Sequence, residues 1–358
     1  MRFGKAHVWG KLCLVASLAL TGSVLAQTAS QLLTVSKPPA SLLPTDPPQG
    51  LIFTSPPDLP STEVFFSADG GPVDLGYLTF DGRGTGYLTF DDGPDKVAPG
   101  GVMIVPELWG RQGQSFAPER DRLITGRRTG LLEPKDLVFA EGVGLVIVAD
   151  FAGADLKVFS TRRAGNVAPL FTASDLGESG GELRRPWGVA YDEAADRLFV
   201  GATDGALLVY NEFLERRGES GPDRTVIPTV GGERASHNLH DLVYLPVTDT
   251  VVVTDVGAAT TGDQPGFDTD GSLLVLEGAS QADGLTPVRA RVHGPASLLG
   301  NPVGLVPRGN KLFVAENALD LVLRFDGLLR QRGDLERVPD AAVSVVKPES
   351  VRLVPVSD

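Results

Sequence analysis

Two series of acidic residues recur at matching places along the chain. The first series stands near the start of short apolar runs and comprises Asp74, Asp136 and Asp241. The second series ends the apolar runs that follow, and it comprises Asp150, Asp255 and Glu316, with Ala202 in the place of a further member. Carboxylates that gather without counter-charges raise one another's pKa or bind a cation. The two series therefore predict a mouth that binds a polar ligand or a metal ion, with the second series as metal ligands.

The alternative for all of these carboxylates is structural, because Asp at a strand end commonly accepts backbone N–H bonds and so caps a turn. That role is the favoured one. Three further side chains complete the predicted ligand-binding mouth: His240, Asn317 and Trp187. His240 and Asp241 are neighbours in an expected strand, so they point to opposite faces and cannot both line one channel. We therefore expect His240 to be a packed or loop histidine, with a role as ligand or general base as the alternative.

A Gly- and Asp-rich insertion spans residues 262–271 and contains Asp263, Asp268 and Asp270. The Asp-x-Asp-Gly fragment at its end is part of calcium-loop chemistry. The distal Glu of a twelve-residue calcium loop is missing, because Ala279 stands there. We expect a surface loop near the channel mouth, with Ca²⁺ binding by these aspartates as the alternative.

Two short motif matches lack the elements that their chemistry needs. Gly177–Gly181 has the spacing of a nucleophile elbow, but it lies in a polar loop rather than between a strand and a helix. Gly82–Gly86 is glycine-rich, but no helix follows it to bind a phosphate. Neither motif predicts an active site.

The elements that must position these residues are short strands in a repeated unit. One phrase recurs as Pro134-Lys-Asp-Leu-Val-Phe, Pro186-Trp-Gly-Val-Ala-Tyr and Leu239-His-Asp-Leu-Val-Tyr, and a second apolar run follows each copy. Further copies begin at Pro72, Asn301 and Pro348. The aligned positions within successive copies are 62, 52, 53, 63 and 46 residues apart, and they are Asp74, Asp136, Gly188, Asp241, Gly304 and Ser350. A propeller blade of four strands takes about 40 to 50 residues. The pattern predicts an all-β, six-bladed β-propeller.

The last unit is cut short by the end of the chain, so we expect the N-terminal part to supply its missing strands. A closed ring leaves no unpaired sheet edge. The obvious donors are Leu51–Thr54 and Glu63–Phe66. They are predicted to pair with Val351–Val354 and to close the ring within one blade.

The repeated phrase, followed by Arg197-Leu-Phe-Val or Lys311-Leu-Phe-Val, resembles the NHL-repeat propellers and equally the six-bladed gluconolactonase and regucalcin-type propellers. The resemblance covers roughly residues 130–330. It implies a six-bladed ring and, in the lactonase-like families, an Asn on the first strand that binds a divalent cation. This chain has Lys135, Trp187 and Val303 at such positions, none of which can supply the oxygen ligands that calcium needs. The departure puts lactonase activity in doubt.

The N-terminal part of the sequence predicts where in the cell the protein is located. Residues 1–26 have the basic start, apolar run and small-residue end of a secretory signal, and residues 27–50 form a Pro- and Ser-rich stretch that we interpret as a linker. The propeller domain is then expected over residues 51–358. The only cysteine, Cys13, lies in the signal, and Leu12 before it argues against a lipid-attachment site. We expect a secreted or periplasmic protein, with an uncleaved, membrane-anchored signal as the alternative.

The formal net charge of -13 makes nucleic-acid binding improbable, since an acidic surface repels phosphate. No later segment is apolar enough to be a transmembrane helix. The favoured function is that of a monomeric, non-catalytic binding or scaffolding module for a protein or a small polar ligand. The alternative is a metal-dependent hydrolase of the lactonase or esterase type, which uses the following residues: Asp136, Asp150, Asp241, Asp255 and Glu316. Ca²⁺ is the one cofactor that the sequence suggests.

Overall fold

The computed structural model describes residues 32–36, 50–54, 64–68, 71–72, 74–91, 100–258, 260–261, 264–265 and 270–353. Strands dominate this part of the chain, which confirms the all-β prediction. Helical structure in it is limited to short 3₁₀ turns: η1 (Leu108–Arg111), η2 (Arg127–Thr129), η3 (Glu193–Ala195), η4 (Pro246–Thr248), η5 (Pro295–Ser297) and η6 (Leu328–Arg330). No helix within the described ranges is long and apolar enough to cross a membrane.

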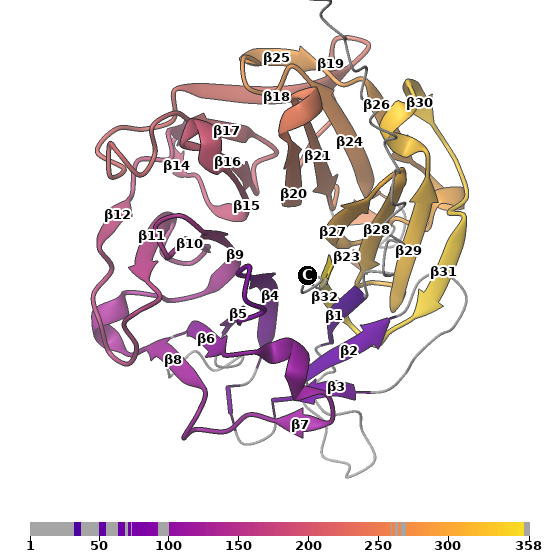
Figure 1. Ribbon diagram of the computed structural model, residues 1–358. Coiled ribbons are helices and arrows are strands. Elements are labelled where there is room, and N and C mark those ends of the chain that lie inside the picture. The colour runs from indigo at the N-terminus through magenta and orange to yellow at the C-terminus, as the bar shows by residue number, and fades with distance from the viewer. Residues whose placement is uncertain are drawn as a thin grey trace, which may run out of the picture.

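The described strands form six sheets of four or more strands, arranged around a common axis (Figure 1). We name each sheet by its innermost strand. Three of them are composed of β4 (Leu75–Phe80), β5 (Gly86–Phe90), β6 (Gly101–Val105) and β8 (Arg122–Thr125); of β9 (Pro134–Ala140), β10 (Leu145–Asp150), β11 (Asp155–Ser160) and β12 (Phe171–Ala173); and of β15 (Pro186–Asp192), β16 (Arg197–Ala202), β17 (Leu207–Tyr210), β18 (Arg224–Val230) and β19 (Glu233–Arg234).

The other three sheets continue around the axis. They are composed of β20 (Leu239–Leu245), β21 (Thr250–Asp255), β24 (Ser272–Glu277), β26 (Ala290–His293) and β30 (Gly333–Leu335); of β27 (Pro302–Arg308), β28 (Lys311–Glu316), β29 (Leu321–Asp326) and β31 (Ala341–Ser344); and of β32 (Pro348–Leu353), β1 (Leu32–Ser36), β2 (Gly50–Thr54), β3 (Val64–Ser67) and β7 (Gln114–Ser115). Smaller pairings involve β25 (Gly284–Pro287) beside β18, and the hairpins β13 (Glu178–Ser179) with β14 (Glu182–Leu183) and β22 (Thr260–Thr261) with β23 (Gln264–Pro265).

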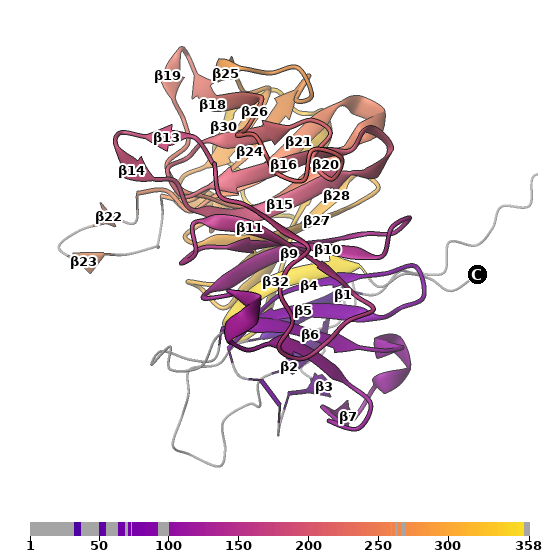
Figure 2. The ribbon, with the colours of Figure 1, turned by 90° about the vertical axis from the view of Figure 1, so that its left-hand side faces the viewer.

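The inner strands make the ring. In the order β4, β9, β15, β20, β27 and β32, each inner strand contacts the next, and β32 contacts β4. Figure 2 shows the sheets from the side, stacked face to face. The prediction of a β-propeller is confirmed.

The core lies between neighbouring sheets. The second strand of a sheet is buried almost throughout, as β21 shows, because each of its faces packs against another sheet. Between the β9 and β15 sheets, for example, Ile147 and Val158 pack in one cluster with Val189, Val200 and Leu208. Such burial contributes roughly 1.5–3 kcal/mol for each large apolar side chain. This is why the second strands are nearly continuous apolar runs.

The first and last described strands lie in one sheet, but the strand that pairs with β32 differs from the one expected. β1 pairs antiparallel with β32, and Leu33 lies opposite Arg352. β2 and β3, which include most of the predicted donors, follow further out in the same sheet. Their predicted direct pairing with residues 351–354 was therefore wrong, because β1 lies between; Val354 lies outside the described residues.

β1 also corrects the predicted domain boundary. It falls inside residues 27–50, which composition indicated to be a linker, and all five of its side chains are buried. Leu33 and Val35 pack into the core beside β3 and β4. The propeller thus includes Leu32–Ser36, and the predicted signal, residues 1–26, lies outside the described residues.

Candidate functional site at the axis

Each inner strand from β4 to β27 carries a β-bulge near its start, and the bulge fixes which residue faces the axis. In β20 the register passes from Leu239 opposite Asp255 to Leu242 opposite Val253. β4 has the same shift, from Leu75 opposite Phe90 to Leu78 opposite Leu88. A bulge re-aims the side chains beside it.

This register shows that Tyr77, not Asp74, matches Asp241. The backbone N–H of Tyr77 donates to Thr89 Oγ1, as that of Asp241 does to Thr254 Oγ1. Asp74 precedes β4 with a φ of 55°. The alignment that placed Asp74 in the first acidic series was therefore wrong.

The matching positions around the axis alternate in type. In ring order they are Tyr77, Asp136, Gly188, Asp241, Gly304 and Ser350. Asp136 Oδ2 accepts the N–H of Val189 at 2.9 Å, and Asp241 Oδ2 accepts that of Leu305 at 2.7 Å. Ser350 Oγ accepts the N–H of Leu78 at 3.3 Å. Every second inner strand therefore holds the next through one side chain.

The glycines in this series lie close against the inner strand that follows their own. A Cβ on Gly188 would lie 1.8 Å from the carbonyl oxygen of His240, and a Cβ on Gly304 would lie 2.8 Å from Cα of Ser350. Both distances are too short for any side chain. At these two positions the backbone of the next inner strand lies where a side chain would be, and glycine permits that close approach.

Arg352 joins the two buried aspartates. Its Nη1 lies 2.8 Å from Asp241 Oδ2, and its Nη2 lies 3.4 Å from Asp136 Oδ1. Both carboxylates are fully buried. Burial and the charge of Asp241 raise the pKa of Asp136 to about 8, while Arg352 and the N–H donors of Val189 and Leu137 oppose the rise. The pair of aspartates is thus compensated by Arg352, from the sheet that contains both chain ends.

An aromatic stack fills the axis beside these charges. Trp187 Nε1 donates to Tyr77 Oη at 2.9 Å, and that hydroxyl donates to the carbonyl of Val303 at 2.5 Å. The imidazole of His240 stacks on Trp187 with ring centroids 3.8 Å apart, and Lys135 Nζ lies 4.8 Å from the Trp187 ring. Burial, then the charge of Lys135, lowers the pKa of His240 to about 3, so the imidazole is neutral.

The second acidic series caps loops. Asp150 accepts the N–H groups of Leu132 and Glu133, the latter at 2.7 Å. Asp150 also accepts a 2.8 Å bond from Lys157. Each of these contacts lies within the β9 sheet or the loop that leads into it. The carboxylate therefore fixes the entry to its own inner strand.

Asp255 and Glu316 repeat this arrangement in their own sheets. Asp255 accepts the N–H of Asn238 at 2.7 Å, and Glu316 accepts that of Leu319 at 2.7 Å. The three members of the series are thus bonded separately. Within the described ranges, no group of three or more His, Cys, Asp or Glu side chains could hold a metal ion. The contacts of Asp150, Asp255 and Glu316 are those expected of side chains that cap turns.

The remaining predicted residues lie apart from the Arg352 cluster. Asn317 Nδ2 donates to the carbonyl of Pro348 and to Glu349 Oε1, at 3.3 and 3.2 Å, and so links the end of β28 to the start of β32. Asp270 lies two residues before the first residue of β24. Asp263 and Asp268 lie outside the described residues.

Sequence reasoning missed Tyr77 and Arg352. Two residues past the ring position, the other inner strands carry Thr79, Val138, Ala190, Val243 and Val306, whereas β32 carries Arg352. A charged side chain at this one place in six aligned strands is the signal that could have identified it. All six residues line a cavity of about 210 Å³ on the axis, and among its described lining residues only Arg352 is charged.

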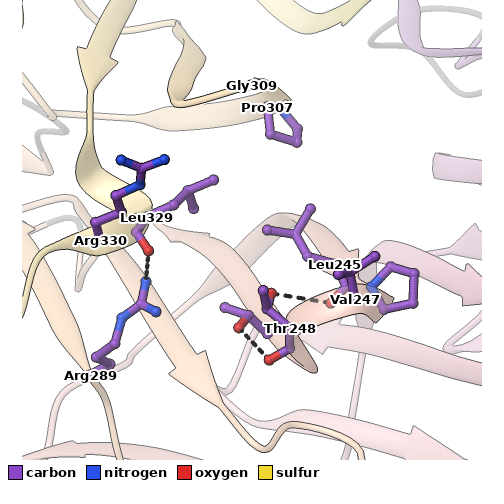
Figure 3. A pocket seen from close by; sticks show the side chains of 10 residues that line it. Leu245, Val247, Thr248, Arg289, Pro307, Gly309, Leu329 and Arg330 are labelled. Carbon is purple, nitrogen blue, oxygen red and sulfur yellow. Dashed lines mark hydrogen bonds between the residues drawn. The ribbon is translucent and has the colours of Figure 1, made fainter. Parts of the chain in front are cut away.

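A second hollow of about 470 Å³ shares Pro307 with the axial cavity (Figure 3). Its walls are mostly apolar and come from the turns after β20 and β27 and from η6: Leu245, Pro246, Val247, Pro307 and Leu329. Val247 is 97% exposed. Arg289 and Arg330 also line the hollow, and Arg289 donates to the carbonyl of Leu329 at 2.6 Å. Among the described residues that line the hollow, none is acidic.

Comparison with known proteins supports the fold and assigns no family. No protein-family model and no curated protein matches the chain. Among solved structures, the chain is similar to one in the structure described as "Crystal structure of Nidogen/Laminin Complex". The two are 12% identical, the likeness covers 91% of this chain and 98% of that one, and the TM-score is 0.53. At this identity the likeness concerns the fold alone.

Proposed function

We propose that the chain is a secreted or periplasmic six-bladed propeller that acts as a non-catalytic binding module. The six sheets, with inner strands in contact around the axis and both chain ends in one sheet, support the blade number. One observation supports a binding role over a catalytic one. The carboxylates of the predicted mouth already accept hydrogen bonds from N–H groups of the protein itself.

A hydrolase of the lactonase type needs carboxylates free to hold a metal ion or to move a proton. Here Asp136 and Asp241 bond to backbone N–H groups and to Arg352. Asp150, Asp255 and Glu316 bond to the loops of their own sheets. These bonds stabilise the ring and use the oxygens that a metal would need, which favours a binding module over the hydrolase alternative.

The binding surface is proposed to be the apolar hollow around Val247, with an apolar side chain of a partner protein as its occupant. Large apolar side chains at the centre of a contact supply most of the binding energy in protein complexes. Arg330 is exposed and forms no side-chain ion pair or hydrogen bond within the described ranges. An acidic residue beside the partner's apolar residue would complement it. The similar chain comes from a structure named for a complex of two proteins, which agrees with this role.

The surface is tested by capture of proteins from the native envelope with purified wild-type and variant chains. Val247→Asp places a charge in the hollow and should abolish capture of a partner that the wild type retains. Leu285→Asp is the matched control, since Leu285 is 69% exposed on β25, outside the hollow. Equal capture by wild type and Val247→Asp would refute this surface.

The hydrolase alternative is tested separately. Thermal unfolding is measured with Ca²⁺ and with EDTA, and a panel of lactones and esters is screened for turnover. We expect no metal-dependent shift and no hydrolysis. Turnover that Asp255→Ala abolishes would overturn the non-catalytic role.

A further inference from the structure

A polar pocket of about 480 Å³ lies between the β4 and β9 sheets, apart from the axis and the apolar hollow. Its walls include the turn between β4 and β5 and the turn between β9 and β10. The apolar hollow is formed by the corresponding turns of other sheets, so both open on one face of the ring. A pocket of this volume accommodates a small molecule.

Three arginine side chains line the pocket: Arg83, Arg122 and Arg162. Within the described residues, none of them forms a side-chain hydrogen bond or an ion pair. Arg83 and Arg162 are exposed, and Arg122 is half-buried. The chain carries 45 acidic residues against 32 basic ones, yet three guanidinium groups without such bonds line this one pocket. They leave up to fifteen N–H donors around one cavity, at about five for each arginine.

The two carboxylates that line the pocket are already bonded to other donors. Asp81 Oδ1 accepts the N–H groups of Arg83 and Thr85 at 3.0 and 2.8 Å, and its Oδ2 accepts the Tyr87 hydroxyl at 3.1 Å. Glu141 Oε2 accepts the N–H of Gly82 at 2.9 Å. Both acidic residues therefore shape the turn between β4 and β5 and leave the guanidinium groups unbonded.

The rest of the lining suits a ligand with a ring. Tyr87 and Phe139 stack with centroids 5.0 Å apart and an interplanar angle of 11°, and both line the pocket. Thr85 adds a hydroxyl group, whereas the hydroxyl of Thr161, which also lines the pocket, donates to the carbonyl of Gly144 at 3.0 Å. Hydroxyls beside an aromatic wall bind polyols, and forked guanidinium groups bind tetrahedral oxyanions through paired bonds.

We propose that this pocket binds an oxyanion ester of a sugar, in which the phosphate or sulfate lies among Arg83, Arg122 and Arg162. The sugar ring lies against Phe139. The site is independent of the apolar hollow and adds a small-molecule specificity to the protein-binding role proposed above. The overall negative charge repels the anion elsewhere on the surface and so restricts it to this pocket.

The proposal is tested by calorimetric titration of the purified chain with glucose 6-phosphate, glucose 6-sulfate, inorganic phosphate and neutral glucose. We expect the two esters to bind, inorganic phosphate to bind more weakly, and glucose not to bind. Addition of salt should weaken the binding, because screening reduces attraction between exposed charges. The arms with phosphate and sulfate esters identify which oxyanion the site prefers.

Variants then locate the site. Arg122→Gln, Arg83→Gln and Arg162→Gln should each weaken ester binding, by about 10-fold for Arg122 because charge-assisted bonds are the strong ones. The latter two alter exposed side chains and so leave folding intact. Arg330→Gln is the matched control, an exposed arginine on the same face outside this pocket. Val247→Asp should also leave ester binding unchanged, which separates this proposal from the protein-binding surface.

Three results would overturn the proposal. Binding of glucose as tight as that of its esters would remove the role of the anion. Wild-type affinity in all three pocket variants, as in Arg330→Gln, would place any binding elsewhere. No heat of binding for either ester at concentrations up to about 10 mM, well above the roughly 1 mM dissociation constant of a weak complex, would exclude the site.

Discussion

Arg352 is the residue on which the charge balance of the axis depends. It is the partner of two fully buried aspartates that come from different sheets, and its own side chain is only 16% exposed. Removal of one partner from a buried ionic group leaves charge without compensation, at a cost of about 3–5 kcal/mol. A substitution of Arg352 therefore measures the free-energy cost of a buried carboxylate without its cation.

Arg352→Met should lower the free energy of unfolding at neutral pH by about 3–5 kcal/mol, because the buried carboxylate of Asp241 loses its cation. The second substitution Asp241→Asn, made in that background, should restore part of the loss. Urea unfolding of the three chains measures both effects. Arg330→Met is the control and should change stability by less than about 0.5 kcal/mol. A similarly small effect for Arg352→Met would show that the cluster is not a structural ion pair.

The raised pKa of Asp136 predicts how stability depends on pH. Because this pKa is about 8 in the folded protein, against an ordinary value of 3.8, the folded chain retains a proton that the unfolded chain has lost. The stability from this group is thus fully present below about pH 4 and is lost as the pH rises through about 8. Asp136→Asn removes the titrating group, so its unfolding free energy should fall less between pH 5 and pH 8 than that of the wild type.

The slope with pH, measured by urea unfolding, is the readout for Asp136→Asn. The absolute stability is not, since an amide nitrogen would face the N–H donors of Val189 or Leu137. Identical slopes for wild type and variant would show that Asp136 does not hold this proton.

At the scale of elements, the repeated phrase was sufficient to predict strands, sheets and their order, but not the first strand. Leu32-Leu-Thr-Val-Ser36 is short and lies in a stretch whose prolines and serines indicate an extended linker. Its strand character comes from long-range pairing with β32 and β2, which composition does not reveal. The bulge in the inner strands also depends on strand pairing, so the sequence did not reveal it. Without the bulge, the equivalence of Tyr77 and Asp241 could not be recognised.

The candidate site could be predicted only in part. Asp136 and Asp241 were correctly placed at equivalent positions, because both stand in the same repeated phrase. Which groups they bind could not be predicted, since Arg352 and the N–H of Val189 or Leu305 come from other repeats. Spacing identifies the position of a side chain within a unit, whereas its partner depends on how the units close upon one another.

The role of β1 is tested by two shortened chains. A chain that begins at Leu32 keeps β1, whereas one that begins at Lys37 lacks it. The second chain should melt at a clearly lower temperature, because β32 would lose its hydrogen-bonded neighbour and Leu33 and Val35 would leave the core. Equal melting temperatures would mean that residues 32–36 act as a linker after all.

At the scale of the whole molecule, the ring positions many loops on two faces around an axis that its own side chains occupy. Trp187, Tyr77 and His240 pack against one another there, and Arg352 lies between the aspartates. The axial cavity that remains, of about 210 Å³, is smaller than the apolar hollow and the arginine-lined pocket, which have about 470 and 480 Å³. We therefore expect ligands at the face where these two lie. The side chains at the axis thus stabilise the ring, whereas the loop residues at the faces can change to suit a ligand without affecting it.

The proposed secretion makes a direct prediction about the mature chain. When the full-length protein is produced with its first 26 residues, it should be exported and should begin at Gln27, because the small residue Ala26 ends the predicted signal. N-terminal sequencing or intact-mass measurement of the exported protein checks this. A chain that keeps Met1 and stays with the membrane fraction would favour the anchored alternative.

Around the axis, positions whose side chains accept an N–H bond from the next inner strand alternate with positions whose side chains do not. The acceptors are Asp136, Asp241 and Ser350, and the positions between them hold Gly188, Gly304 and Tyr77. Such an alternation closes on itself only when the number of inner strands is even, because an odd ring would place two acceptors, or two positions without one, side by side. Duplication of a single sheet would therefore break the alternation, whereas duplication of two adjacent sheets would keep it.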